Sequence, residues 1–228
     1  MQRSTTLLLP AIAGFVDTST FIHVSGLFAA HFTGNFILFA AALARGVTPN
    51  DYLKLLSFFF FTYAVWAGTW VYKMTQRRGF RIYGVVSLLL LEAILLLAVS
   101  LIAAMFPESR FDAPLAMTLV VAMGLQNALH YFTPGPMSTA MTGNAMRWIA
   151  VLAERFMPFQ EPAGVQTGEL SPAAAKPQQP IGSVILSFAV GCVVSAFLTM
   201  HFGLSANLLP GVIVMMIALV EKQQQYIA

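Results

Sequence analysis

The sequence predicts an all-α polytopic membrane protein that forms a single membrane domain over residues 1–228. Three observations lead to this fold class. Hydrophobic residues make up 58% of the chain, against roughly 45–50% in a soluble globular protein on a similar count. Charged residues make up 9%, against about 25%, which is too few to cover a water-exposed surface. The mean hydropathy is +0.76.

The apolar residues form long runs, which favours helices over a transmembrane β-barrel. Barrel strands of ~10 residues alternate apolar and polar side chains, whereas Leu95–Met105 does not alternate and has Ser100 as its only polar residue. A helix needs about 20 apolar residues to cross a hydrocarbon core of ~30 Å. Eight segments are candidates: Leu7–Ile22, Gly26–Ala44, Leu53–Tyr72, Ile82–Phe106, Ala113–Tyr131, Met137–Ala153, Ile181–His201 and Leu204–Val220.

The first and the sixth of these segments border unusual sequence. The N-terminus resembles a signal peptide, because the first apolar run follows Met1, Gln2 and Arg3. No convincing small-residue cleavage site follows, so we expect an uncleaved membrane helix. The connections are short except for 158–180, which holds five of the twelve prolines. That composition predicts an exposed, flexible loop.

Two motifs recur at a nearly constant offset and predict two pseudo-symmetric repeats. Thr33-Gly34-Asn35 recurs as Thr142-Gly143-Asn144, 109 residues later, and Gly14-Phe-Val-Asp17 matches Gly124-Leu-Gln-Asn127 at an offset of 110. Their shared order indicates a duplication. Repeat one would cover residues 7–107 and repeat two residues 113–221, with the loop 158–180 as an insertion.

The basic residues favour six transmembrane crossings plus two Thr-Gly-Asn segments that are broken or re-entrant; eight crossings are the alternative. Cytoplasmic loops are enriched in Lys and Arg. With a cytoplasmic N-terminus, six crossings place eight counted basic residues inside and three outside, and eight crossings place seven inside and four outside. The outside residues are Arg45, Lys54 and Arg110 in the first case, and Lys73, Arg77, Arg78 and Arg81 in the second.

The number of crossings also decides how the repeats are related. Three crossings per half would make the repeats inverted. Inverted repeats with discontinuous helices are a recurrent transporter architecture, and their binding site lies near the bilayer midplane. Four crossings per half would make the repeats parallel, which transporters also use.

The sequence carries no signature of an enzyme, a metal centre or a nucleic-acid-binding protein. It has no G-x-G-x-x-G after a strand, no P-loop, no H-E-x-x-H and no G-x-S-x-G. Cys192 is the only cysteine, and the net charge of +3 comes from basic residues at the ends of apolar runs. We therefore predict no catalytic residues, no cofactor, no metal and no nucleic-acid partner. The four histidines are scattered and would form a metal site only by tertiary convergence.

Asp17, Glu92 and Arg147 are ionisable residues that interrupt apolar runs. Each costs at least ~2.5–3.5 kcal/mol at a helix centre, so each should face the bundle interior or a water-filled cavity. Glu92 is either a proton- or cation-coupling carboxylate, or a packing residue that is protonated or paired with Arg147. Asp17 is either a ligand-facing carboxylate, or a cap at the membrane face or a hydrogen-bonding residue at a helix interface.

The Thr-Gly-Asn pairs are the strongest local feature. Glycine lets the backbone bend or approach another helix, and threonine and asparagine satisfy backbone groups that a break exposes. The motifs are either substrate-facing breaks or two packing crossings at which Gly34 and Gly143 touch. We favour packing for the glycines and a functional role for Asn35 and Asn144.

Polar residues around both motifs predict a polar cavity between the two halves. His31 with Asn35, and Gln126 with His130, are i, i+4 pairs that share a helix face. Alternatively, each side chain makes a hydrogen bond between helices that stabilises their packing by under ~2 kcal/mol. The candidate substrate-binding or coupling residues are Asp17, His31, Thr33, Asn35, Glu92, Gln126, Asn127, His130, Thr142, Asn144 and Arg147.

At these motifs the chain resembles the YoaK-like family of bacterial membrane proteins of unknown function. The resemblance rests on two stretches in each half. They are Gly14-Phe-Val-Asp17, Gly26-Leu-Phe-Ala-Ala-His-Phe-Thr-Gly-Asn35, Gly124-Leu-Gln-Asn-Ala128 and Thr139-Ala-Met-Thr-Gly-Asn144. The resemblance implies an integral protein of the bacterial cytoplasmic (inner) membrane and brings no established substrate or reaction.

We expect a multi-pass inner-membrane protein with a cytoplasmic N-terminus, which has the lipid bilayer as its partner and is compatible with a homo-oligomer. The first hypothesis for its function is a small-solute transporter with a site between the repeats. The alternatives are a membrane-embedded enzyme that uses His31, His130 and Asp17 on a lipid-soluble substrate, and a non-catalytic partner of other membrane proteins. We favour a role without catalysis.

Overall fold

A computed structural model describes residues 3–77, 81–107, 111–133, 136–156 and 181–227, and all regular secondary structure in these ranges is helical. This confirms the all-α fold class. The Pro-rich segment 158–180 lies outside the described residues. The elements are α1 (Arg3–His23), α2 (Phe32–Arg45), α3 (Asp51–Arg77), α4 (Arg81–Met105), α5 (Asp112–Leu129), α6 (Met141–Phe156), α7 (Ile181–Phe202), the 3-10 helix η3 (Gly203–Asn207) and α8 (Leu208–Ile227).

The helices follow the predicted apolar segments, except that two of them begin late. Helix α2 begins at Phe32 and α6 at Met141, and each is preceded by a non-helical segment of several residues. The break therefore precedes the Thr-Gly-Asn motif, which occupies the first turn of each helix. Helix α1 ends before Ser25 and Gly26, whose φ angles are 48° and 75°. This left-handed conformation terminates helices and favours glycine.

Three helical runs in the described residues are long and apolar enough to cross a membrane: Asp51–Arg77, Tyr83–Met105 and Ile181–Gln223, which joins α7, η3 and α8. Leu7–His23 and Phe32–Arg45 are shorter apolar helices. Helices α2 and α6 have 14 and 16 residues. At a rise of 1.5 Å per residue they extend about 21–24 Å, which is less than a hydrocarbon core of ~30 Å.

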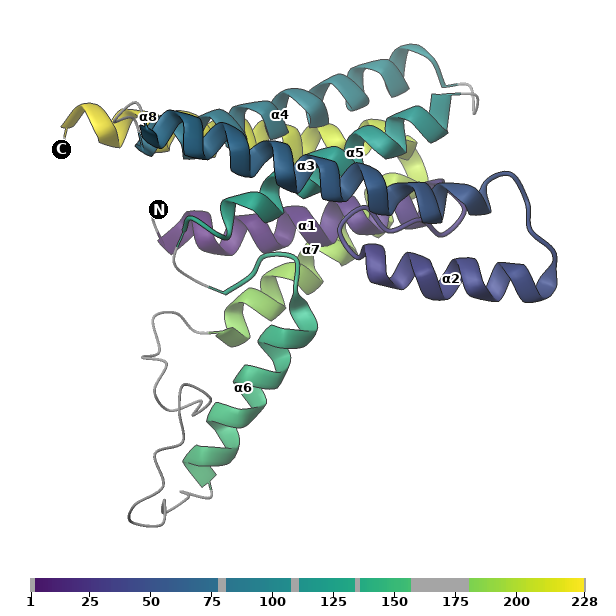
Figure 1. Ribbon diagram of the computed structural model, residues 1–228, viewed down its shortest axis with the longest axis horizontal. Helices are drawn as coiled ribbons and strands as arrows, with labels where there is room; N and C mark the ends of the chain where they lie inside the picture. Colours follow the sequence, from purple (N-terminus) through teal and green to yellow (C-terminus); the bar gives the residue numbers. More distant parts are fainter. Residues whose placement is uncertain (1–2, 78–80, 108–110, 134–135, 157–180, 228) are drawn as a thin grey trace.

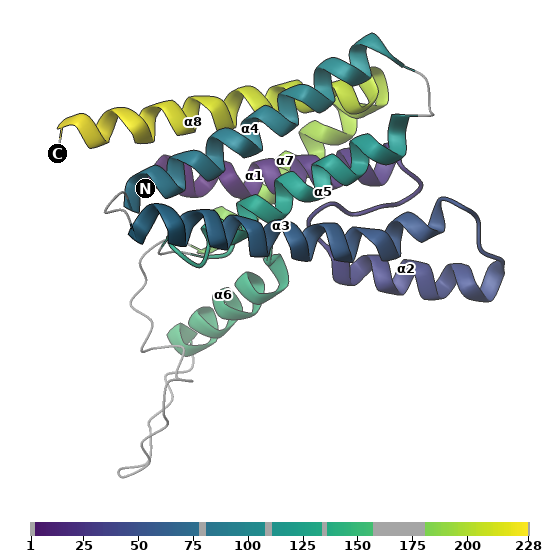
Figure 2. The same ribbon diagram turned by 45° about the horizontal axis from the view of Figure 1, so that its top comes forward.

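The long helices pack in three main pairs. Helix α1 packs along α7, α3 along α5, and α4 along α8, while α2 lies on α3 and α6 on α7. Figures 1 and 2 show that the N- and C-terminal ends of the chain lie at the same end of this bundle. In both views α6 projects away from the bundle, and the segment after α1 turns back along the bundle before α2 begins.

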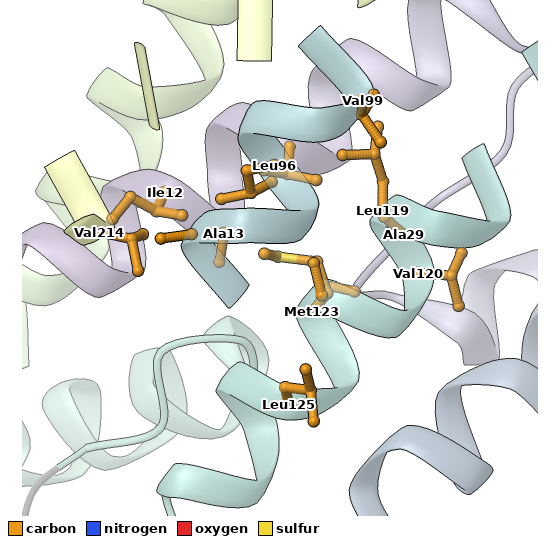
Figure 3. Packing of buried hydrophobic residues seen from close by; sticks show 14 of the residues in the cluster. Ile12, Ala13, Ala29, Leu96, Val99, Leu119, Val120, Met123, Leu125 and Val214 are labelled. Carbon is orange, nitrogen blue, oxygen red and sulfur yellow. The ribbon is translucent and has the colours of Figure 1, made fainter. Parts of the chain in front are cut away.

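The core lies where α1, α4, α5 and α8 meet. Side chains of Ile12, Ala13, Leu96, Met123 and Val214 lie close to one another there (Figure 3), and each is at most 2% exposed. Between helices in lipid, association is driven by van der Waals packing, interhelical hydrogen bonds and lipid entropy rather than by the hydrophobic effect. Close fit in this region therefore matters more than the amount of apolar surface.

Glycines allow the closest contact in the bundle, between α1 and α7. A Cβ atom at Gly191 would lie 2.0 Å from the carbonyl oxygen of Ala11, and one at Gly14 would lie 2.3 Å from that of Phe188. Small residues that let backbones approach are a common packing device between membrane helices. The glycines of the Thr-Gly-Asn motifs do not act this way: a Cβ at Gly34 would meet the ring of Phe28, and one at Gly143 would meet none of the described residues within 4 Å. The expected contact between Gly34 and Gly143 was wrong.

Replacing Gly191 with alanine is expected to lower the melting temperature of the purified protein in lipid nanodiscs. The added methyl group would overlap the Ala11 carbonyl, a backbone group that moves only if α1 separates from α7. Overpacking of this kind costs ~1–3 kcal/mol. Gly143→Ala is the matched control, because its methyl group would enter open space. A Gly191→Ala protein that melts no lower than Gly143→Ala would contradict the role of this contact.

Candidate functional site

The break before α2 is held by the side chain of Asn35. Its Oδ1 accepts a hydrogen bond from the Phe28 N–H (2.9 Å), and its Nδ2 donates to the Phe28 carbonyl (2.8 Å) and to Ser57 Oγ (2.8 Å). Ser57 lies on α3 and donates to the carbonyl of Lys54. Backbone groups away from water must be satisfied inside the protein. Asn35, which is fully buried, therefore fixes the break and ties it to α3.

Asp17 and His31 form the ionisable pair of the site. Asp17 lies on α1 and is 3% exposed; its Oδ1 accepts a hydrogen bond from the Ala30 N–H (2.6 Å), and its Oδ2 contacts His31 Nδ1. His31 is the residue before α2 and is half-buried. When Nδ1 of His31 carries a proton, it donates a hydrogen bond to the Asp17 carboxylate.

Aromatic rings flank the imidazole of His31. The Phe28 ring lies 6.2 Å from it and the Phe188 ring, on α7, lies 5.7 Å from it, both measured between ring centroids in edge-on arrangements. Asp17 occupies Nδ1. Nε2, for which the described residues supply no hydrogen-bond partner, is then the nitrogen left to interact with a ligand.

The second half of the chain repeats part of this arrangement. Asn144 Nδ2 donates to the Met137 carbonyl (2.6 Å), seven residues before it, as Asn35 does to Phe28. Asn127 Oδ1 accepts a hydrogen bond from Thr139 Oγ1 (2.8 Å), at the position that matches Asp17 and Ala30. The second half has no carboxylate at this position, so the ionisable pair exists in the first half alone.

Gln126 joins the second break to α1 and does not pair with His130. Its Nε2 donates to the Leu9 carbonyl and to Ser138 Oγ, both at 2.9 Å. Helix α5 ends at Leu129, and His130 follows it half-buried. The i, i+4 pair of His31 and Asn35 likewise separates, because His31 precedes the helix.

The three ionisable residues that interrupt apolar runs have different environments. Asp17 and Glu92 are buried, as expected for residues that face the interior. Arg147 is exposed on α6, so it does not face the bundle interior, and its other expected position, in a water-filled cavity, stays a prediction. Both carboxylate oxygens of Glu92 lack a hydrogen-bond partner in the described part of the chain. Glu92 is therefore not paired with Arg147.

The remaining candidate site residues differ in how far their side chains are exposed. Asn127 is half-buried, whereas Thr33 and Thr142 are exposed. Within the described ranges no group of three or more His, Cys, Asp and Glu side chains could hold a metal ion. His31, His130 and a carboxylate thus do not converge on one point there.

Several residues of the site escape prediction from sequence. Ser57 and Phe188 lie on α3 and α7, far from the motifs in the chain, and reach the site through helix packing. Ser57 is a single polar residue ahead of four phenylalanines, which is a weak signal that could have identified it. Ser138 and Thr139 had a clearer signal, because they lie four and three residues before Thr142 of the second Thr-Gly-Asn motif.

Asn35→Ala is expected to destabilise the protein and to loosen the break before α2. The substitution removes three hydrogen bonds and leaves the Phe28 N–H and carbonyl unsatisfied, at ~1–3 kcal/mol for each buried group. Hydrogen exchange of residues 27–30 in nanodiscs, followed by mass spectrometry, should become faster. Thr33→Ala, at an exposed site two residues away, should leave exchange unchanged. Equal exchange in the two variants would show that Asn35 does not hold the break.

Comparison with known proteins finds a family and no characterised relative. The model of a family described as "Protein of unknown function (DUF1275)" matches residues 5–220. No curated protein and no solved structure matches the chain significantly.

Proposed function

The chain belongs to the DUF1275 family of proteins of unknown function, in agreement with its resemblance to the YoaK-like family, and we propose that it is a small-solute transporter of the bacterial inner membrane. The Asp17–His31 pair at the break before α2 carries this proposal. Ionisable residues among membrane helices are costly, and they commonly mark the paths of substrates or ions. The pair joins a carboxylate on α1 to an imidazole in a non-helical segment that turns back along the bundle.

Within this pair the two residues have different roles. One oxygen of Asp17 accepts a hydrogen bond from the Ala30 N–H and the other contacts Nδ1 of His31. Asp17 therefore positions the imidazole and the segment before it. His31 is the binding residue, and its Nε2 donates or accepts a hydrogen bond according to protonation. Phe28 and Phe188 limit the space around the imidazole. Asn35 is a positioning residue that acts through the backbone of Phe28.

The short helices support the transport hypothesis independently. In many secondary transporters, helices that are interrupted within the membrane form the binding site, because their free ends and unwound backbone face the solute. Helices α2 and α6 are too short to cross the core, and each begins after a non-helical segment. Irregular backbone at membrane depth is tolerated where it is buried in protein or lines a cavity.

The two halves are best explained as inverted repeats with six crossings. The Asn35 and Asn144 hydrogen bonds span seven residues in both halves, and α1 packs on α7 as α5 packs on α3. In Figure 1, α1 runs away from the end that holds both termini, whereas α5 runs towards it. Equivalent helices with opposite directions are what inverted repeats require.

The alternatives receive less support. An enzyme that uses His31, His130 and Asp17 would need both histidines near one carboxylate, and the described residues contain no such cluster. A non-catalytic partner protein would have no need for a positioned Asp–His pair. The small residues at the closest helix contact, Gly14 and Gly191, are occupied within the chain between α1 and α7.

Single cysteines can test the number of crossings. In a Cys192→Ser background, Gln76→Cys and Gln223→Cys lie at the exposed ends of α3 and α8. With six crossings both are on one side of the membrane, whereas with eight they are on opposite sides. A membrane-impermeant maleimide added to intact spheroplasts should therefore label both or neither, and Asn50→Cys should behave oppositely. Labelling of one of the first two alone would establish eight crossings.

His31→Gln is expected to abolish solute movement. Purified protein would be reconstituted into vesicles loaded with a soluble metabolite extract of the host cells, and loss of each metabolite would be followed by mass spectrometry. Vesicles with wild-type protein should lose at least one solute faster than empty vesicles, and His31→Gln vesicles should not. Gln76→Ala, exposed near the end of α3, is the control for reconstitution. If wild-type and empty vesicles retain the same solutes, the protein is not a transporter.

A further inference from the structure

Glu92 is a buried carboxyl group that the Asp17–His31 site does not use. It lies near the middle of the apolar run Tyr83–Met105 of α4 and has no exposed surface. Neither of its oxygens has a hydrogen-bond partner among the described residues. A buried polar group without a partner is rare in proteins and calls for a specific explanation.

The surroundings of Glu92 are apolar. Leu88 and Leu96 lie one turn before and after it on the same face of α4, and both are fully buried. Leu88 reaches the contact between Gly68 of α3 and Leu125 of α5, and Leu96 reaches Gly211 of α8. Figure 3 shows Leu96 among core side chains of α1, α5 and α8. Glu92 therefore lies on α4 between the contact that Leu88 makes with α3 and α5 and the contact that Leu96 makes with α8.

No charged group compensates Glu92 within the described ranges. Helix α5 carries Asp112 at its start, α8 carries Glu221 and Lys222 near its end, and η3 has no titratable side chain. On α3, Tyr72 packs against Gly84, two turns from Glu92. The other titratable groups of α3 lie near its ends or on its exposed face: Asp51, Tyr52, Lys54, Tyr63, Lys73 and Arg77.

These surroundings determine the protonation state of Glu92. An ionised carboxylate in an apolar interior is far more costly than the neutral acid. A metal cation would need several oxygen ligands, and α4 is a continuous helix here, so its carbonyls are engaged in helical hydrogen bonds. The proton is the cation that this site accommodates.

We propose that Glu92 binds the coupling proton of the transport cycle: it is protonated in this conformation and releases the proton when α4 separates from α5 and α8 enough to admit water. This inference rests on the proposed transport function. It assigns the proton as the coupling ion and the contacts of α4 as the moving part. Solute would then bind at the Asp17–His31 pair and the proton at α4.

The first measurement needs no solute. Infrared spectra of the full-length protein in nanodiscs at neutral pH should contain the carbonyl band of a protonated carboxylic acid, and Glu92→Gln should lack it. Asp112→Asn is the matched control and should retain the band. Glu92→Gln keeps the shape and neutrality of the protonated acid, so it should melt at the wild-type temperature. Absence of the band from the wild-type protein would overturn the inference without any variant.

The second measurement tests coupling. Vesicles containing the protein and a pH-sensitive dye would receive the soluble metabolite extract outside, and inward solute movement and internal acidification would be recorded together. Wild type and Asp112→Asn should acidify the interior, and Glu92→Gln should lose this acidification. Solute movement without acidification in the wild type, or acidification that persists in Glu92→Gln, would overturn the inference and leave transport standing. No solute movement in the wild type would overturn the transport function, and this inference with it.

Discussion

The hydrogen bonds between the Asn35 side chain and the backbone of Phe28 are the interaction on which the site depends. The chain leaves α1, runs without helical structure to His31 and starts α2 beside α3. Away from water, each backbone group of such a segment needs a partner. Asn35 supplies two partners at Phe28 and Asp17 supplies one at Ala30. The contacts that satisfy the backbone of the break also place His31 against Asp17. The geometry of the site therefore depends on the break remaining intact.

Close packing of the long helices fixes what lies on the other side of the site. Gly14 and Gly191 bring α1 and α7 into backbone contact, and that approach places the ring of Phe188 beside His31. The relation between this contact and the site is direct, because Gly14 and Asp17 lie one turn apart on α1. A change that separates α1 from α7 would therefore disturb the environment of His31 as well as stability.

Asp17 and Glu92 represent two ways to hold a carboxyl group inside an apolar bundle. Asp17 is buried with an imidazole and a backbone N–H as partners, so its charge is compensated. Glu92 is buried with no partner in the described residues, so the neutral acid is the state that the fold favours. A compensated charge can remain in place while a ligand is exchanged, whereas an uncompensated acid can ionise only if water reaches it. This difference is the basis of the roles proposed above, in which Asp17 positions the binding residue His31 and Glu92 follows a conformational change.

The sequence by itself determined the membrane class, the helical architecture and most helix bounds, because a long apolar run without alternation has few stable alternatives. It also identified the residues at the breaks, since a repeated Thr-Gly-Asn motif is visible without coordinates. Tertiary structure decided how those residues act. Asn35 bonds back to Phe28, and a Cβ at Gly143 would meet no described residue within 4 Å. Arg147 is exposed, and Ser57 and Phe188 join the site from other helices. The reason is physical: spacing along a helix fixes which residues share a face, but the neighbour on that face depends on how helices distant in sequence pack together.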